Sequence, residues 1–390
     1  MAGYEFTDKL VFNDVYIHGT VRDANGVKMS KSLGNGIDPL EIVGQHGADT
    51  LRVSLILATP DGQDPWLSKN SFELGRNFVN KIFQASRFLQ MRTPESFEIH
   101  RSESAPSANL SLPDRWILSK LQGAISEVES AFGAFRLSAA LKALYEFAWN
   151  DFCSWYLELI KPDSAGTPIR TESLQVAYYT LERILRLLHP FAPFFSEELY
   201  TRIFAGGAGE KQPTLVFGPW PAVTPGLQND AIEQSLDCIK QVVEGVRSVR
   251  SEMNVPPGKE SDLYVRVADE GFGRLLEEHY EYFRSLVKVA ELKVGVDVKK
   301  PPLSASLVVS GAEIYIPLAG LIDVEQERSR LGKELERLTG HLDKLGRKLG
   351  NQDFLANAPK DVVDRERAKK ADIEERVEKL NRNLEQLTGW

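Results

Sequence analysis

The chain has 390 residues, of which 42% are hydrophobic and 26% charged, and its formal net charge is −8. This composition is ordinary for a soluble globular protein and gives no indication of disorder, and the length predicts about two to four domains at roughly 150 residues each. Because the total charge is acidic, nucleic-acid binding would require basic side chains gathered on one face.

Membrane insertion and metal binding find no support in the sequence. No apolar run reaches the roughly 20 residues that span a bilayer, and the first residues lack a basic segment followed by an apolar one. The only cysteines, Cys153 and Cys238, are far apart and have no CxxC motif or clustered histidine. We therefore expect a cytoplasmic protein with reduced thiols, no membrane partner and no metal site of its own.

The first part of the chain has the pattern of one end of a parallel α/β domain. Residues 11–17 are rich in β-branched and aromatic side chains and predict a buried strand, and a second extended piece is expected at 20–22. Asp38 and Pro39 predict the N-cap and the first position of a helix.

The middle of the chain predicts an all-α bundle. Apolar residues recur at helical spacing at residues 71–91, 113–132, 135–160 and 171–189. A shorter helix is expected at 194–205. Three tryptophans in these patterns are expected to be core residues, namely Trp116, Trp149 and Trp155.

Residues 227–320 predict a small α/β module. A helix is expected to about Glu252 and another near 270–288. Short strands are expected at residues 263–267, 292–296, 307–309 and 314–317.

The last segment predicts an antiparallel coiled-coil hairpin. Apolar residues alternate by four and three positions at Leu331, Leu335, Leu338, Leu342, Leu345 and Leu349, and again at Ile373, Val377, Leu380, Leu384 and Leu387. The residues expected to break the helix between them are Gly350, Asn351, Phe354, Ala358 and Pro359. Each limb would have roughly 25 residues and be about 37 Å long.

The most specific short motif is the run Lys28, Met29, Ser30, Lys31, Ser32, bounded by glycines. Two lysines three residues apart on a loop of small residues can converge on a polyphosphate, while serine hydroxyls and backbone N–H groups donate to its oxygens. The alternative interpretation is a solvated basic turn.

This motif is similar to the signature loop of class I aminoacyl-tRNA synthetases. Its surroundings resemble the valyl-tRNA synthetase family, in residues 14–19, 32–35 and 47–52. The resemblance continues along nearly the whole chain, through residues 76–81, 151–158, 188–194, 247–257 and 349–359.

The resemblance implies a mainly α, multidomain architecture in four segments. These are the C-terminal remnant of a Rossmann-type α/β catalytic domain, an anticodon-binding helical bundle, a small α/β module and a coiled-coil tRNA-binding arm, at residues 1–65, 66–222, 223–320 and 321–390.

The implied activity is ATP-dependent attachment of valine to its tRNA. Residues 28–32 would bind ATP, with Lys28 and Lys31 stabilising the charge that develops on its phosphates, and Mg²⁺ would accompany the ATP. The implied partners are tRNA(Val), ATP and valine, and we expect a monomer. The family's other signature motif, its valine pocket and its editing domain are not found in this sequence, so the chain alone is expected to be inactive.

Two groups of residues are predicted to contact tRNA. Lys81, Arg87 and Phe88 combine positive charge with a stacking plane, which unpaired anticodon bases require. The alternative is that Phe88 belongs to the core and Arg87 is a solvated charge. A second basic group lies at the hairpin tip, at Lys344, Arg347 and Lys348, where the alternative is a solvated helix surface.

Two other functions remain open at this point. A tRNA-binding protein without catalysis would keep the bundle and the arm, but it would have no need of the lysine loop. A structural coiled-coil protein with an unrelated globular head would explain residues 321–387 alone.

Overall fold

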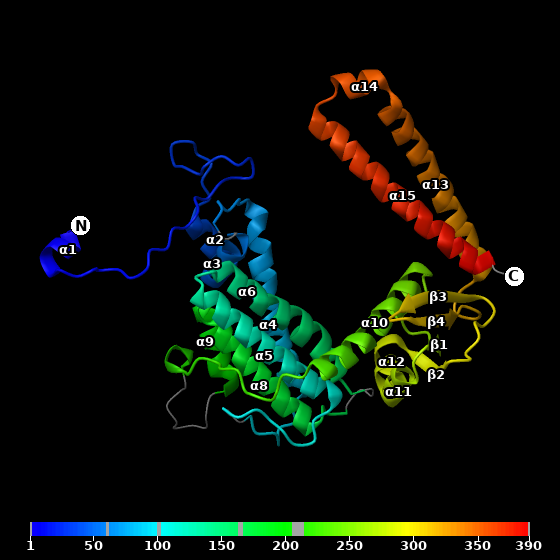
Figure 1. Cartoon of the computed structure of the whole chain (residues 1–390), viewed down its shortest axis with the longest axis horizontal. Coiled ribbons are helices and arrows are strands. Elements are labelled where there is room, and N and C mark those ends of the chain that lie inside the picture. Colours follow the sequence, from blue (N-terminus) through cyan, green and yellow to red (C-terminus); the bar gives the residue numbers. More distant parts are fainter. Residues whose placement is uncertain (1, 60–61, 100–102, 163–166, 205–213, 389–390) are drawn as a thin grey trace. The chain divides into compact units, whose positions relative to one another are not determined.

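A computed structural model describes residues 2–59, 62–99, 103–162, 167–204 and 214–388 (Figure 1). The chain forms two compact units, residues 1–234 and 235–390. Among the described helices, none combines the length and the apolar character needed to cross a membrane.

The first unit begins with short helices, and the predicted loop lies between the first two of them in sequence. They are α1 (Ala2–Thr7), α2 (Pro39–His46), α3 (Ala48–Ala58) and the 3-10 turn η1 (Lys69–Phe72). The predicted start of α2 is confirmed, because Leu40 N donates to the Asp38 carboxylate at 2.9 Å and Pro39 is the first helical residue. Gly47, with φ of 86°, lies in the left-handed region and separates α2 from α3.

The strand predicted at residues 11–17 is wrong. This segment is not paired with any described residue, and its large side chains are exposed, for example Phe12 at 74% and Ile17 at 85%. A strand needs a neighbouring backbone for its hydrogen bonds and cover for its apolar face. In this part of the described chain, pairing is limited to isolated bridges from Arg22 to Lys28 and to Trp66.

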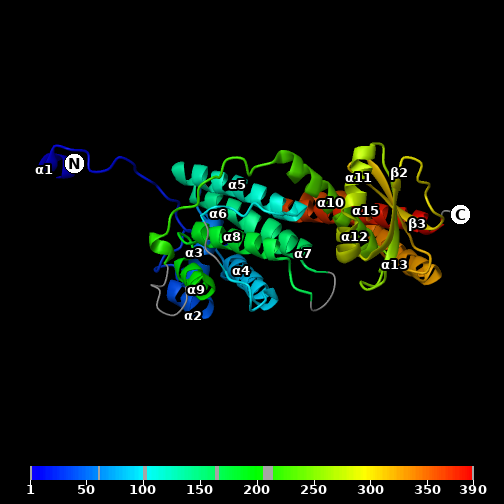
Figure 2. The same cartoon turned by 90° about the horizontal axis from the view of Figure 1, so that it is seen from below.

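The predicted bundle helices are confirmed, with ends shifted by a few residues. They are α4 (Glu73–Arg92), α5 (Leu112–Gly133), α6 (Leu137–Glu146), η2 (Phe147–Tyr156), α7 (Leu157–Leu159), α8 (Thr171–Leu188) and α9 (Pro193–Phe204). A short 3-10 turn, η3 (Leu215–Phe217), follows. The long members α4, α5, α6 and α8 lie side by side (Figures 1 and 2). The helix expected at 135–160 is a continuous run whose middle part, η2, is a π-helix.

A buried carboxylate ties three of these helices together. Asp114 accepts hydrogen bonds from the Tyr156 hydroxyl at 2.8 Å and from the Ser173 hydroxyl at 3.0 Å. It also forms a capping box with Ser111 at the start of α5. Because its oxygens accept hydrogen bonds from residues of the bundle, this side chain fixes how α5, η2 and α8 meet.

The second unit contains the predicted small α/β module. The helix α10 (Asp230–Glu252) leads into it, and the strands β1 (Ser261–Arg266), β2 (Val289–Gly295), β3 (Ser304–Val309) and β4 (Ala312–Pro317) form one sheet in the order β2-β1-β4-β3. The pair β1–β2 is parallel and the other pairs are antiparallel. The helix expected at 270–288 is two helices, α11 (Glu270–Glu278) and α12 (Tyr280–Val287), which meet at His279 and pack against β2.

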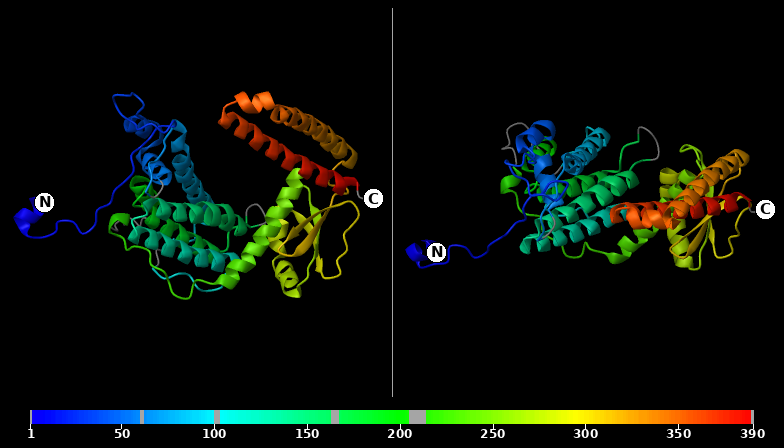
Figure 3. Two further views of the ribbon diagram at one scale, coloured as in Figure 1. Left: turned by 45° about the horizontal axis from the view of Figure 1, so that its top comes forward. Right: turned by 90° about the horizontal axis from the view of Figure 1, so that it is seen from above.

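The terminal hairpin is confirmed as two long helices lying side by side. They are α13 (Val324–Gly350) and α15 (Lys360–Thr388), joined through the short α14 (Gln352–Asn357) (Figure 3). The break predicted at Phe354 is wrong, since this residue lies within α14. The described leucines and other apolar residues of the predicted seam are all buried or half-buried.

The start of α13 is held by a charge network that should make it sensitive to acid. Arg330 donates to both carboxylate oxygens of Glu327, at 2.6 Å and 2.9 Å, and Asn254 donates to the same group at 3.2 Å. The Arg330 hydrogen bonds are the first cause that lowers the pKa of Glu327. This contribution is therefore present above the ordinary glutamate pKa of about 4.3 and is lost as the pH falls through the folded pKa.

Replacing Glu327 by Gln should cost about 1 kcal/mol at pH 7 and less at pH 3, because the wild-type carboxylate becomes increasingly protonated as the pH falls through its folded pKa. Thermal unfolding of the full chain followed by circular dichroism measures the difference. The exposed Glu325→Gln is the matched control in the same helical turn. If the Glu327 variant lost the same stability at both pH values, packing of the side chain, and not its charge, would account for the contact.

Candidate functional site

A small hairpin presents the loop at residues 28–35. Met29 N donates to Val21 O at 3.0 Å, and Asp23 N donates to Val27 O at 2.9 Å. Gly26 turns the chain with φ of 77°, and a side chain there would meet the Trp66 ring at 3.0 Å. The turn therefore requires glycine both for its backbone angle and for the close approach of Trp66.

The hairpin is fastened to the segment before η1. Arg22 Nε donates to Asp64 Oδ2 at 2.6 Å, and Thr20 N donates to Asp64 Oδ1 at 2.7 Å. The hydrogen bond from Thr20, followed by that from Arg22, lowers the pKa of Asp64, and the positive charge of Lys28 adds to this effect. At neutral pH this anchor is therefore an ionised carboxylate.

Asn35 closes the loop onto the hairpin. Its side-chain oxygen accepts from Ser30 N at 3.0 Å, while its Nδ2 donates to Asp23 Oδ2 at 2.9 Å and to Lys28 O at 3.3 Å. The Asn35 hydrogen bond is the first cause that lowers the pKa of Asp23. The Asn35 amide thus holds the backbone on either side of Met29, which gives the first half of the motif a defined path.

The two lysines of the motif are exposed and carry unneutralised charge. Neither Lys28 nor Lys31 forms a hydrogen bond or an ion pair within 4 Å through its side chain to a described residue. Lys31, but not Lys28, lines a hollow of about 890 Å³, together with Ser30 and Gly34. The apolar part of its lining includes Leu51, Leu55, Leu67 and Phe72. The site combines two available cations with neutral donors, which suits an anionic ligand.

The structure brings two of the predicted tRNA-contact residues to one face of α4. Lys81 and Phe88 are two helical turns apart, and each makes a cation–π contact with a residue of η2 or of the loop after α7. Lys81 Nζ lies 5.4 Å from the Trp149 ring centroid, and Lys161 Nζ lies 5.1 Å from that of Phe88. Arg87 is exposed and makes no such contact with a described residue.

The sequence prediction did not identify Trp149 as part of the surface around Lys81. Trp149 was expected in the core, but it is only half-buried and stacks on Tyr145 at 5.4 Å between ring centroids. Trp116 is fully buried, as expected, whereas Trp155 is half-buried. The π-helix, in which Ser154 Oγ donates to Trp149 O at 2.8 Å, is the local feature that sets the position of Trp149.

The basic residues at the hairpin tip do not all face solvent freely. Lys348 Nζ lies 3.4 Å from Glu366 of α15 and 5.0 Å from the centroid of the Phe354 ring. Lys344 and Arg347 are exposed and form no ion pair with a described residue. The structure thus uses Lys348 to join the two limbs and leaves the other two charges available.

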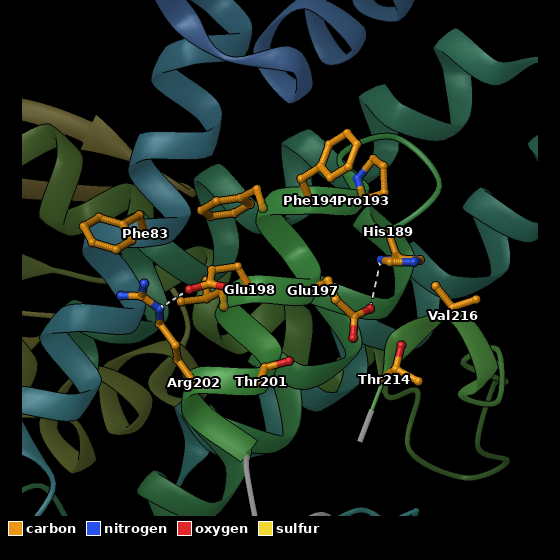
Figure 4. Close-up of a pocket in the computed structure, with 12 residues that line it drawn as sticks. Phe83, His189, Pro193, Phe194, Glu197, Glu198, Thr201, Arg202, Thr214 and Val216 are labelled. Carbon is orange, nitrogen blue, oxygen red and sulfur yellow. Dashed lines mark hydrogen bonds and ion pairs between the residues drawn. The ribbon is translucent and has the colours of Figure 1, made fainter. Parts of the chain in front are cut away.

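Another hollow, of about 840 Å³, lies beside α9 and is shown in Figure 4. Phe83 and Phe194 flank it, and His189 lies 3.9 Å from Glu197 on its wall. None of the residues predicted to bind ATP or tRNA lines this hollow. Its position therefore adds nothing to the chemistry of the loop.

Metal and thiol chemistry have no described site. Within the described ranges, no three His, Cys, Asp or Glu side chains gather as metal ligands. Cys153 is buried, and burial raises its pKa to about 12, so it is protonated at neutral pH. Cys238 is half-buried, and both cysteines are free thiols.

Three family models match the chain in sequence order. The model "tRNA synthetases class I (I, L, M and V)" matches residues 1–68, "Anticodon-binding domain of tRNA ligase" matches 114–266, and "Valyl tRNA synthetase tRNA binding arm" matches 323–388. The three models follow one another along the chain in the order of its lysine loop, its helical bundle and its terminal hairpin. This order places the chain among the class I aminoacyl-tRNA synthetases.

Similar proteins narrow the class to one family. Valine–tRNA ligases of Geobacillus kaustophilus, Enterococcus faecalis and Bacillus subtilis are 38%, 37% and 35% identical over 98–99% of this chain. The chain belongs to the valyl-tRNA synthetase family, whose C-terminal portion it matches, and it spans 43% of the length of these relatives. A solved leucyl-tRNA synthetase complex from Agrobacterium radiobacter overlaps 55% of this chain and 24% of its own, with 26% identity and a TM-score of 0.43.

Proposed function

We propose that this chain supplies the ATP-facing loop and the tRNA-binding surfaces of a valine–tRNA ligase. The observation that carries the proposal is the order of three matches along one chain, beginning at a loop with two unneutralised lysines. The boundaries expected at residues 65, 222 and 320, a cytoplasmic location and a monomeric state remain parts of the proposal.

The loop at residues 28–32 would act on ATP. Lys28 and Lys31 would take up the negative charge that moves onto pyrophosphate as a carboxylate attacks the α-phosphate. Ser30, Ser32 and nearby backbone N–H groups would donate to phosphate oxygens. The described residues offer no cage of side chains for Mg²⁺. A magnesium ion arriving with ATP would therefore keep its phosphate and water ligands, and no residue here is assigned to it.

The bundle and the hairpin would bind tRNA(Val). On α4, Lys81 and Arg87 would neutralise phosphates while Phe88 offers a ring face to an unstacked anticodon base. At the hairpin tip, Lys344 and Arg347 would contact the RNA backbone, and Lys348 would contribute less because Glu366 already pairs with it. The two limbs would pack as a coiled coil through their leucine seam.

Replacing Phe88 by Ala should weaken binding of tRNA(Val) by about tenfold, because loss of one base–aromatic stack costs roughly 1–3 kcal/mol. The measurement is a filter-binding or anisotropy titration of the full chain. Phe83→Ala is the matched control, since Phe83 is an exposed phenylalanine on the same helix and lines the hollow beside α9 instead. Equal binding by the Phe88 variant and the unchanged chain would remove this residue from the RNA surface.

A further inference from the structure

Arg250, near the end of α10, is a buried cation without an acidic partner. It is 7% exposed and donates to three neutral oxygens, Ser261 Oγ at 3.0 Å, Pro256 O at 3.2 Å and Lys259 O at 2.5 Å. Burial lowers its pKa, and no carboxylate counters that effect. Its guanidinium group therefore retains an uncompensated positive charge in a poorly solvated place.

The other buried arginines of the described chain each have an acidic partner. Arg183 and Arg186 are 5% and 8% exposed, and both pair with Glu182, at 2.6 Å and 2.5 Å. Burying a charge costs several kcal/mol unless a counter-charge and hydrogen bonds offset it. Arg250 has the hydrogen bonds but lacks the counter-charge, which leaves a place for an external anion.

A hollow of about 530 Å³ lies against this guanidinium group. Two more cations line it, the exposed Arg247 and Lys288, together with the polar side chains of Ser251 and Asn254, and no acidic residue does. Asn254 of the lining donates to the carboxylate of Glu327 at 3.2 Å, and Arg330 already pairs with this carboxylate at 2.6 Å.

Helix dipoles do not account for three cations here. The C-terminal ends of α10 and α12 lie nearby, and each carries a partial negative charge of at most about half a unit. Arg250 and Lys288 alone carry two full positive charges against two such half-charges, which leaves an excess of about one. Arg247 adds a third cationic group at the edge and also donates to Leu286 O at 3.5 Å. Lys288 is also held in the left-handed region, with φ of 57°, and its carbonyl accepts from Ser261 N at 3.0 Å. Its backbone is thus fixed at the edge of the hollow.

We propose that this hollow binds a phosphate group of the RNA backbone. Two guanidinium groups and a lysine supply positive charge and N–H donors to the oxygens of a phosphodiester, and the polar side chains supply further donors. Because both edge cations are exposed, a phosphate within a polymer reaches them without its neighbours having to enter. The assignment to RNA rests on the proposed tRNA binding, whereas the phosphate chemistry rests on the hollow alone.

The first test measures the salt dependence of tRNA binding by the full chain. Arg247→Gln combined with Lys288→Gln removes both edge charges but keeps Arg250, whose hydrogen bonds hold the 256–261 loop. The slope of log affinity against log salt should fall by about one to two, because each lost phosphate contact removes roughly 0.9. Lys299→Gln with Lys300→Gln is the control, since it removes the same charge from exposed positions of the same unit and should change the slope little.

The second test uses inorganic phosphate alone. At matched ionic strength, phosphate in place of chloride should raise the unfolding temperature of the unchanged chain and of the control more than that of the Arg247/Lys288 variant.

The two tests have separate outcomes. A salt slope of the Arg247/Lys288 variant equal to that of the control overturns the assignment to RNA, even if phosphate still stabilises the chain through the hollow. If the unchanged chain binds no tRNA, the proposed function fails and the phosphate result alone decides the hollow. If the Arg247/Lys288 variant behaves like the control in both tests, the hollow is not a phosphate site.

Discussion

Replacing Lys28 and Lys31 together by alanine will lower valine-dependent ATP–pyrophosphate exchange by roughly 1000-fold in a full-length enzyme that carries this chain as its C-terminal portion. Removal of one preorganised donor from a developing negative charge typically costs a factor of about 100 to 1000. Here two charges are lost together from a loop whose lysines have no competing ion pair with described residues. The loss should fall mainly on kcat, because the charge is fully developed only in the transition state.

The matched control for this pair is Lys69→Ala. Lys69 is also an exposed lysine of the first unit, but it lies on η1 and is 3.5 Å from Glu41. Its removal changes net charge without touching the loop, so the exchange rate should stay within about twofold, since an exposed ion pair contributes little. A double variant that exchanges pyrophosphate as fast as this control would contradict the assignment of the loop.

Replacing Glu182 by Ala will destabilise the first unit by about 3–5 kcal/mol. Glu182 is 2% exposed and pairs with both Arg183 and Arg186, so its removal leaves two buried guanidinium groups with less neutralisation. Glu103 approaches the same arginines, at 3.7 Å and 3.1 Å, but it is 69% exposed and offsets only part of the loss. Urea unfolding followed by tryptophan fluorescence reports on this unit, which contains five of the six tryptophans.

The chain provides a close control for this result. Glu198 and Arg202 of α9 have the same four-residue spacing and the same 2.5 Å separation as Glu182 and Arg186. Their side chains are more than 60% exposed, and Glu198→Ala should cost only about 0.3–0.5 kcal/mol. Similar losses for the two variants would mean that burial does not set the strength of these pairs.

Local sequence signals predicted the elements that depend on neighbouring residues. Asp38 and Pro39 marked the start of α2, and the repeating leucines predicted both limbs of the terminal hairpin, because a helix stripe and a cap are set within a few residues. The lysine motif was likewise visible, since its meaning lies in five consecutive side chains.

Features that depend on distant partners were not visible in the sequence. Residues 11–17 have strand composition, but a strand forms only when another backbone lies beside it, and no described residue supplies one. Trp149 comes to Lys81 only because η2 packs against α4, and Lys348 meets Glu366 only because the hairpin closes. Phe354 is among the residues predicted to break the helix, yet α14 includes it.

Binding of tRNA by the unchanged chain tests the central claim most directly. The titration compares tRNA(Val) with the same tRNA carrying an altered anticodon, at low salt and with the full chain. The account predicts that both bind through backbone contacts and that the altered anticodon weakens binding by about tenfold, the loss expected for one stacked or hydrogen-bonded base. Equal affinity for the two RNAs, or no binding to either, would contradict an anticodon-reading role for the bundle.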